Sequence, residues 1–265
     1  MLVDFSHILT FSMLFIAAVF DVRSELGDVP DVFPAAAVVG GIVLHAAQAY
    51  IIGSWQPLLY SLGVGAVFSV YGWAAYWKGM WGGADAFALS ALGFGAPYLT
   101  LSLPGVVRHS TSLFINIVLV AFIYTLVFSV VRAFRKEGFF SELVERFKGF
   151  RKEISLVAGF GLVAFGIFDP IYALGVYTLI LLSTFTFLFL KTVEEYAMVE
   201  KVDADELNGG EVLKGDRIRG VTAEEAKELN GEVEVVHGLR FLPVFPIALL
   251  LTDAGLTLIQ YFLSV

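Results

Sequence analysis

The chain has 265 residues, of which 58% are hydrophobic and 16% are charged, and 25 of them are Phe. Soluble globular domains do not use this mixture, so the composition indicates an integral membrane protein. The chain has no Cys, which excludes disulfides, thiolate nucleophiles and Cys-ligated zinc, and its four His residues show no paired spacing. We therefore expect no metal, no cofactor and no nucleic-acid partner.

Apolar runs of a length that can cross a bilayer recur along the whole chain, since a helical span needs about 17 to 25 residues. The runs are continuously apolar and lack the alternation of a barrel strand, which favours helices. We predict an all-α polytopic membrane protein with about eight transmembrane helices, six plus an additional pair. The predicted spans are Val3–Phe20, Phe33–Ile52, Pro57–Trp77, Ala86–Leu103, Leu113–Val131, Ile154–Phe168, Tyr172–Leu190 and Leu242–Leu263.

Two polar stretches interrupt the spans and divide the chain into five parts. In the first stretch, Phe139, Leu143 and Phe147 recur at helical spacing among mixed charges, which predicts an amphipathic helix at the membrane surface. In the second stretch, Thr222 followed by Glu225 predicts a helix start within a small mixed insert. The predicted parts are a transmembrane core (1–133), the amphipathic helix (134–153), the additional helix pair (154–191), a cytoplasmic insert (192–239) and a C-terminal transmembrane helix (240–265).

The distribution of Lys and Arg predicts the orientation, because cytoplasmic loops carry an excess of these residues. With both termini outside, every Lys and Arg except Arg108 falls on the inner side of the membrane. This orientation puts Asp21, at the end of the first span, and Asp85, at the start of the fourth, on the cytoplasmic face. We therefore expect a multi-pass protein of the cell membrane with both carboxylates at one surface.

Asp21 and Asp85 are the leading candidates for chemistry, since ionisable groups at membrane depth are costly and usually functional. Two carboxylates that share one water titrate as a unit, so one can act as a base and the other as an acid. Gly82 and Gly83 precede Asp85 and can allow a close backbone approach or a positive φ. A substrate strand could therefore lie against this part of the chain.

An acidic segment follows Asp21 and includes Glu25, Asp28 and Asp31. These residues either form a collar that attracts a basic substrate or simply solvate a loop, and the sequence leaves both interpretations open. Arg23 is better suited to pairing with an acid or a lipid phosphate than to bond cleavage. We count these four residues among the candidate substrate-binding residues.

Three motifs occur in this order along the chain: Asp21-x-Arg23, Gly82-x-Ala84-Asp85 and Gly238-Leu-Arg-Phe-Leu-Pro243-Val-Phe-Pro246. They resemble those of the archaeal type IV prepilin and preflagellin peptidases. These are intramembrane aspartyl proteases related in motif to presenilin and signal peptide peptidase. The family pattern is Gly-x-Gly-Asp, so Ala84 departs from it by one methyl group.

The resemblance implies that Asp21 and Asp85 form a catalytic pair and that Pro243 and Pro246 lie near it. It implies endoproteolytic removal of a short basic leader from a pilin-like or archaellin precursor at the cytoplasmic membrane face. Bacterial relatives use a cysteine-based zinc element and also N-methylate their products. The absence of Cys indicates a chain that only cleaves.

Two other classes of function compete with the peptidase. A small transporter could use Asp21, Asp85 and Asp253 to relay protons or to bind a cation. A non-enzymatic assembly subunit is the third possibility, but it gives the two carboxylates no role. Asp253 could also be a buried hydrogen-bonding group or a substrate contact, whereas Asp169 before Pro170 predicts a turn. The sequence does not specify an oligomeric state.

Overall fold

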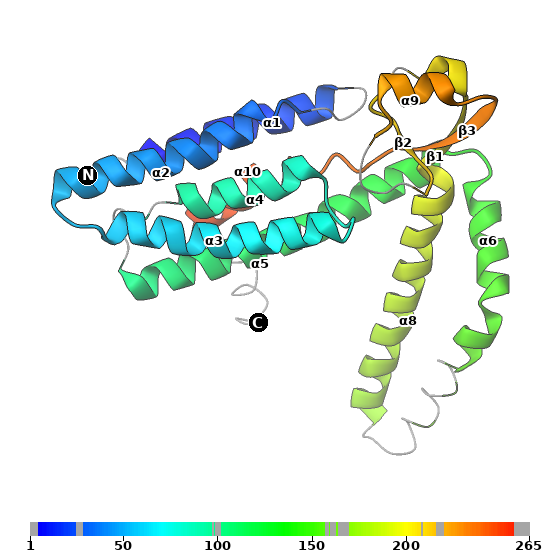
Figure 1. The fold of residues 1–265 in the computed structure, drawn as a ribbon. Coiled ribbons are helices and arrows are strands. Elements are labelled where there is room, and N and C mark those ends of the chain that lie inside the picture. Colours follow the sequence, from blue (N-terminus) through cyan, green and yellow to red (C-terminus); the bar gives the residue numbers. More distant parts are fainter. Residues whose placement is uncertain are drawn as a thin grey trace.

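The computed structural model of the protein describes residues 5–24, 29–96, 98, 102–156, 159, 163, 170–207, 209–215 and 220–256. Within these residues the chain is mostly helical, and three parts can be distinguished: a helical bundle, a helical hairpin and a small insert (Figure 1). The bundle consists of α1 (Phe5–Arg23), α2 (Val32–Ile52), α3 (Gln56–Trp77), α4 (Gly83–Gly95), α5 (Leu103–Arg135) and α10 (Val244–Asp253).

Helix α4 lies at the centre of the bundle, where it contacts α1, α2, α3 and α10. Most of its side chains are buried, and many of them are small. Small residues let helix backbones approach closely in membrane proteins. A Cβ at Gly41 of α2 would lie 2.9 Å from the Phe94 carbonyl oxygen, and a Cβ at Gly93 would lie 2.8 Å from the Cα of Gly65. Glycines thus allow α2 and α3 to cover the C-terminal half of α4.

Five helices of the described residues are long and apolar enough to cross a membrane, which supports a polytopic membrane protein. They are α1, α2, α3, α5 and the segment Ala173–Ala197. The predicted number of eight is not confirmed. The sixth predicted span, Ile154–Phe168, and the end of the last one, up to Leu263, lie largely outside the described residues.

The predicted boundaries of the fourth and fifth spans are wrong. Helix α4 ends at Gly95 instead of Leu103, and Ala96 is extended (φ −67°, ψ 161°). The cause is Pro97, because a residue that precedes proline disfavours the helical conformation. Helix α5 begins at Leu103 instead of Leu113, because the polar residues near His109 continue the helix instead of preceding it.

The helical hairpin consists of α6 (Phe139–Gly149) and α8 (Pro170–Thr192), and α8 continues into the single π-helical turn η2 (Val193–Ala197). Helix α6 lies within the predicted amphipathic segment and exposes charged residues while it buries Phe139 and Leu143, and its place at the membrane surface stays a prediction. The helix begins after Gly138, whose φ of 74° separates it from α5. The buried residues of α6, Phe139 and Leu143, pack with Val193 and Ala197 of η2.

The insert is a three-stranded antiparallel sheet with the strand order β1-β3-β2, so the predicted mixed character is present. Its elements are β1 (Val199–Asp203), the 3₁₀ turn η3 (Ala204–Glu206), β2 (Val212–Leu213), α9 (Ala223–Glu228) and β3 (Glu232–Val236). The predicted helix start is confirmed: the Glu225 amide donates to the Thr222 hydroxyl (3.2 Å), and the Thr222 amide donates to the Glu225 carboxylate (2.9 Å). Strand β3 leads directly to α10.

Candidate functional site

Asp21 lies in the last turn of α1 and its side chain is buried. The Leu242 backbone N–H donates a hydrogen bond of 3.1 Å to its Oδ2 atom. The Arg240 guanidinium, close by, donates to the Val22 carbonyl oxygen, and its charge acts on that of Asp21. The segment between β3 and α10 therefore contacts the end of α1 and supplies a hydrogen-bond donor to the Asp21 carboxylate.

Asp85 is the third residue of α4 and is partly buried. Its Oδ2 atom accepts a hydrogen bond of 3.1 Å from the N–H of Gly82, the residue that caps the helix. A carboxylate in the first turn also interacts favourably with the helix dipole. This arrangement gives Asp85 a structural role in starting α4, and it fixes the direction of the side chain.

The structure brings Asp21 and Asp85 together at one end of the bundle. The two carboxylates are close enough for the charge of Asp21 to act on Asp85. Helices α1 and α4 contact each other, and both contact α10. Figure 1 shows this end of the bundle next to the insert. Both candidate carboxylates therefore lie at the same end of the bundle, within electrostatic range of each other.

An aromatic cluster joins the two segments that carry the backbone donors. Trp81, which precedes Gly82, has its ring centroid 5.9 Å from that of Phe241 and 6.2 Å from that of Phe245. The Tyr71 ring contacts Trp81 from α3 at 5.7 Å. Edge-to-face pairs at such distances are favourable beyond the area they bury. The cluster therefore links the N-terminal end of α4 to the start of α10.

Pro243 and Pro246 shape the start of α10. Pro243 is its N-cap residue, and Pro246 is buried in the first turn, where a missing backbone N–H removes no intrahelical hydrogen bond. They place Leu242, whose N–H contacts Asp21, immediately before the helix. This agrees with their expected proximity to the carboxylates, and a direct contact with substrate stays a prediction.

The positive-φ interpretation of Gly82 and Gly83 is wrong. Gly82 is extended (φ −73°, ψ 162°) and Gly83 is the first residue of α4. A Cβ at Gly82 would lie 3.4 Å from Asp85 Oδ2, an ordinary contact distance. Ala84 is helical and packs against the core, so the departure from the family pattern does not disturb the backbone. The contribution of Gly82 is its N–H group.

The acidic collar is only partly described. Glu25 and Asp28 lie outside the described residues. Asp31 is exposed and is the N-cap residue of α2, and Arg23 is exposed at the end of α1. Their substrate-binding roles stay predictions.

Asp253 belongs to the opposite end of the bundle. Its Oδ2 atom lies 2.8 Å from Nε2 of His7, in the first turn of α1. His7 and Asp21 are separated by 14 residues along α1, or about 21 Å at the helical rise. The predicted turn at Asp169 lies outside the described residues.

The sequence interpretation missed three groups near the carboxylates. The sequence assigns Arg240 no role beyond a loop charge within a motif, and it does not show where the Leu242 N–H points. Tyr124 of α5 packs against the core beside them, where the charges of both Asp21 and Arg240 act on it. The one available signal was the motif around Pro243, which contains Arg240 and Leu242.

Among the described residues, no group of three or more His, Asp or Glu side chains could hold a metal ion. No protein-family model matches the chain, and no curated protein matches it at a significant level of similarity. The functional argument therefore depends on the geometry around the two carboxylates.

Proposed function

We propose that the protein is an intramembrane aspartic endopeptidase that uses Asp21 and Asp85 to activate water. The observation that carries the proposal is that two carboxylates, from α1 and α4, lie within electrostatic range of each other, and that each accepts a hydrogen bond from a backbone N–H group. A structural carboxylate needs no second one within electrostatic reach, because like charges in a poorly solvated site repel. An acid–base pair requires this proximity.

In the proposed reaction, one carboxylate removes a proton from water while the water oxygen attacks the carbonyl carbon of the scissile peptide. The other, protonated carboxyl group donates its proton to the carbonyl oxygen. Collapse of the tetrahedral intermediate breaks the C–N bond and returns a proton to the departing amine. Asp21 faces the positive charge of Arg240, so we assign the base to Asp21 and the acid to Asp85.

The proposed substrate is a pilin-like or archaellin precursor with a short basic leader, cut at the cytoplasmic membrane face. The support is the motif resemblance and the acidic residues after Asp21, of which Asp31 is exposed. Negative charge near the site raises the local concentration of a basic peptide. No N-methylating activity is proposed.

The transporter is the weaker alternative. A relay through Asp253 would have to bridge about 21 Å of helix α1, and the Asp253 carboxylate pairs with His7 instead. The geometry therefore favours a site at one end of the bundle over a path along it.

The decisive experiment incubates membranes that contain the protein, or its Asp21→Asn or Asp85→Asn variant, with a precursor bearing a Lys/Arg-Gly leader. Asn keeps the size and the hydrogen-bonding capacity of Asp but cannot accept a proton from water. We expect both variants to lose cleavage activity although each is present in the membranes in the same amount as the parent protein. The Asp253→Asn variant, which changes a carboxylate at the opposite end of the bundle, is the control. Normal cleavage by either Asn variant of the pair would refute the proposal.

A further inference from the structure

The α6–α8 hairpin is held together along one side of α8. The ring centroids of Phe139 and Phe189 lie 5.8 Å apart, and those of Phe147 and Phe185 lie 5.5 Å apart. These pairs bring the length of α6 alongside the C-terminal half of α8. The two helices of the hairpin therefore pack side by side, with their axes roughly aligned.

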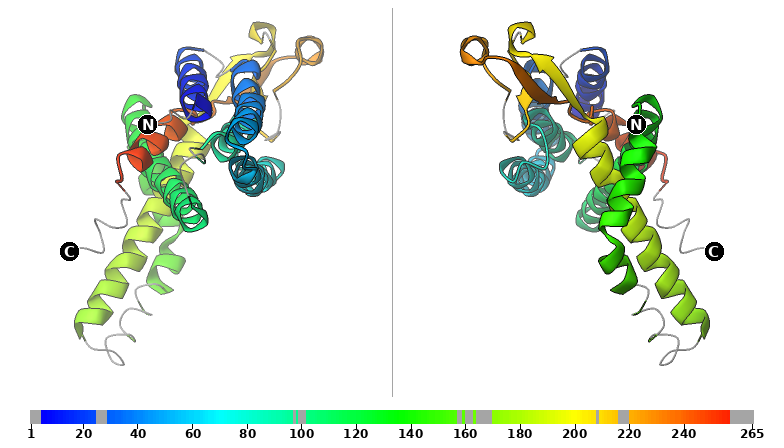
Figure 2. Two further views of the ribbon diagram at one scale, coloured as in Figure 1. Left: turned by 90° about the vertical axis from the view of Figure 1, so that its left-hand side faces the viewer. Right: turned by 90° about the vertical axis from the view of Figure 1, so that its right-hand side faces the viewer.

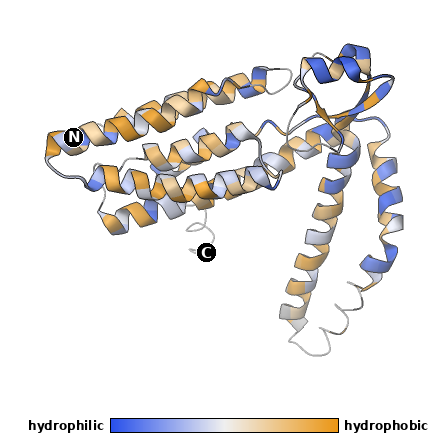
Figure 3. Ribbon diagram, viewed as in Figure 1, coloured by the Kyte–Doolittle hydropathy of each residue, from blue (hydrophilic) through white to orange (hydrophobic). Residues whose placement is uncertain are grey.

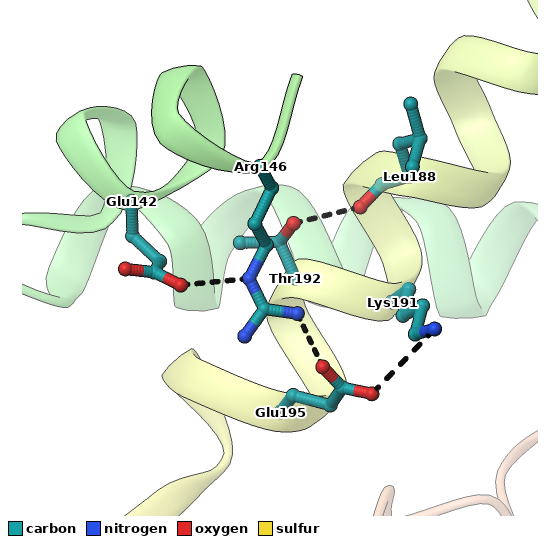
Figure 4. A network of polar contacts seen from close by, with 6 residues as sticks. All are labelled: Glu142, Arg146, Leu188, Lys191, Thr192 and Glu195. Carbon is teal, nitrogen blue, oxygen red and sulfur yellow. Dashed lines mark hydrogen bonds and ion pairs between the residues drawn. The ribbon is translucent and has the colours of Figure 1, made fainter. Parts of the chain in front are cut away.

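A charged network fixes the same two helices near the bundle (Figure 4). The Arg146 guanidinium of α6 donates to Glu142 Oε1 at 2.8 Å and also to Glu195 of η2. Lys191 approaches the other oxygen of Glu195 at 3.9 Å. Charged groups therefore lie between α6 and the end of α8, where a helix crossing a membrane would be leaving it.

The hairpin does not run parallel to the bundle. In Figure 1, α6 and α8 leave the end of α5 that adjoins the insert and are steeply inclined to α1, α3 and α5. The views of Figure 2, turned by 90°, show the same inclination. If the bundle helices cross the bilayer, α8 runs closer to the membrane plane than to its normal.

The two helices of the hairpin differ in their surfaces (Figure 3). The exposed side chains of α8 are almost all apolar, and α6 exposes several charged ones. A soluble protein does not expose an apolar surface of this extent. The large exposed apolar residues of α8 are Ile171, Leu174, Val176, Leu179, Ile180, Leu181, Leu182, Phe185 and Phe187.

An upright α8 would carry the charges of α6 into the hydrocarbon. Phe185 lies seven residues before Thr192, the end of α8, which corresponds to about 10 Å of helix. Phe147 packs at this level, and next to it Glu145 and Lys148 form an ion pair whose side chains are 65% and 61% exposed. A charged side chain inside the hydrocarbon is costly, and the cost grows with depth. An in-plane hairpin avoids this cost.

We propose that the α6–α8 hairpin lies along the surface of the lipid bilayer, at the membrane face that carries Asp21 and Asp85. The exposed apolar residues of α8, which surround the helix, are immersed in the boundary between headgroups and acyl chains, and α6 packs beside its C-terminal part and turns its charges to water. This arrangement replaces the span expected at Tyr172–Leu190. It is independent of the proposed peptidase activity.

The hairpin is connected to the candidate site through the insert. Helix α8 continues through η2 into β1, which pairs with β3, with Val199 opposite Val236. From β3 the chain leads through Arg240 to Leu242, which contacts Asp21. A hairpin on the bilayer surface therefore determines how far the segment from Arg240 to Leu242 lies from the lipid.

The absence of Cys allows a direct test with single-cysteine variants carrying a nitroxide label, reconstituted in phosphatidylcholine and phosphatidylglycerol vesicles. Val176→Cys and Phe187→Cys report on α8, and Leu59→Cys and Val70→Cys report on α3. Both pairs are 11 residues apart at exposed apolar positions, so an upright helix separates each pair by about 16 Å in depth. Accessibility to oxygen and to a water-soluble nickel chelate gives the depth of each label.

We expect the depth difference on α8 to be less than about half of that on α3, because an in-plane helix gains little depth along its length. A label at Lys148→Cys should collide with the nickel chelate. Equal depth differences on α8 and α3, or a label at position 148 that is protected from the chelate, would overturn the proposal. A flat profile on α3 would also overturn it, since the orientation is defined relative to a bundle that crosses the membrane.

Discussion

The two ends of the helical bundle both contain aspartates, and the partners of these aspartates differ. At one end, Asp21 and Asp85 accept hydrogen bonds from the backbone N–H groups of Leu242 and Gly82 and act on each other electrostatically. At the other end, Asp253 pairs with the side chain of His7. Backbone donors fix a carboxylate without neutralising it, whereas a His partner can share its charge. The partners thus distinguish a candidate reactive pair, Asp21 and Asp85, from a structural contact between two helices, His7 with Asp253.

The contact between His7 and Asp253 joins two helices. His7 lies in the first turn of α1 and Asp253 is the last residue of α10. Their contact joins the ends of α1 and α10 that are remote from Asp21. An ion pair at a partly exposed position contributes about 1 kcal/mol or less. We therefore expect the two ends to respond very differently to the same chemical change.

The largest expected contrast compares Asp→Asn changes at the two ends. Asp21→Asn and Asp85→Asn should each lower kcat for leader cleavage by about 1,000-fold, the range of general acid–base catalysis. The double variant should be no worse than either single one, because residues that act as a unit are not additive. Single-turnover cleavage of a labelled precursor measures this difference.

Asp253→Asn supplies the control for that contrast. It should keep cleavage within about 3-fold of the parent chain and lose only the stability of a partly exposed pair. A large loss of cleavage in Asp253→Asn would erase the distinction between the two ends and would favour a function that uses both.

The next contrast compares two arginines at the same end. Arg240 donates to the Val22 carbonyl and faces Asp21, whereas Arg23 is exposed. Hydrogen bonds that involve a charged group contribute about 1.5–3 kcal/mol, so Arg240→Gln should lower kcat by about 10- to 100-fold with little change in KM. Arg23→Gln should have a smaller effect on kcat. Equal losses in the two variants would show that positive charge matters at this end and that the position of Arg240 does not.

The sequence was informative where function depends on local residue types. The membrane class, the candidate carboxylates and the start of α9 at Thr222 all follow from composition or from short motifs. Loop charges predicted one membrane face for Asp21 and Asp85, which agrees with their common end of the bundle. Short-range physics determines these features, so one chain is sufficient to identify them.

Contacts between distant parts of the chain were not predictable. Nothing near Asp253 indicates that its partner is His7, 246 residues away. Hydropathy also placed the end of α4 too late, because it measures apolar character and ignores the effect of Pro97 on the backbone of Ala96. Hydropathy likewise contains no information about the charged helix α6 that packs beside the end of α8.

A third contrast compares two glycines, Gly93 of α4 and Gly63 of α3. Gly93 faces α3, where an added Cβ would lie 2.8 Å from the Cα of Gly65 and 3.0 Å from the Val64 carbonyl oxygen. Backbone atoms cannot give way cheaply, so Gly93→Ala should destabilise the bundle by about 1–3 kcal/mol. Gly63→Ala on α3, where an added Cβ would meet nothing within 4 Å, is the control. Unfolding in a mild detergent with increasing denaturant measures both, and equal stability of the two variants would contradict the close packing of α3 and α4.

The last contrast is at Gly82, where two substitutions at one position separate the effect of an added side chain from the loss of the backbone donor. Gly82→Ala keeps the N–H, and the φ of −73° suits any residue, so its stability should change by less than about 0.5 kcal/mol. Its KM should rise a few-fold if substrate lies against this segment.

Gly82→Pro is the matched variant, because the proline ring fixes φ near −65° but removes the N–H that donates to Asp85. Loss of one hydrogen bond to a charged group should lower kcat by about 10-fold or more, with KM as in Gly82→Ala. Precursor titrations under steady-state conditions separate the two constants. Identical kcat values for the Ala and Pro variants would mean that the Gly82 donor does not orient Asp85 for reaction and only starts helix α4.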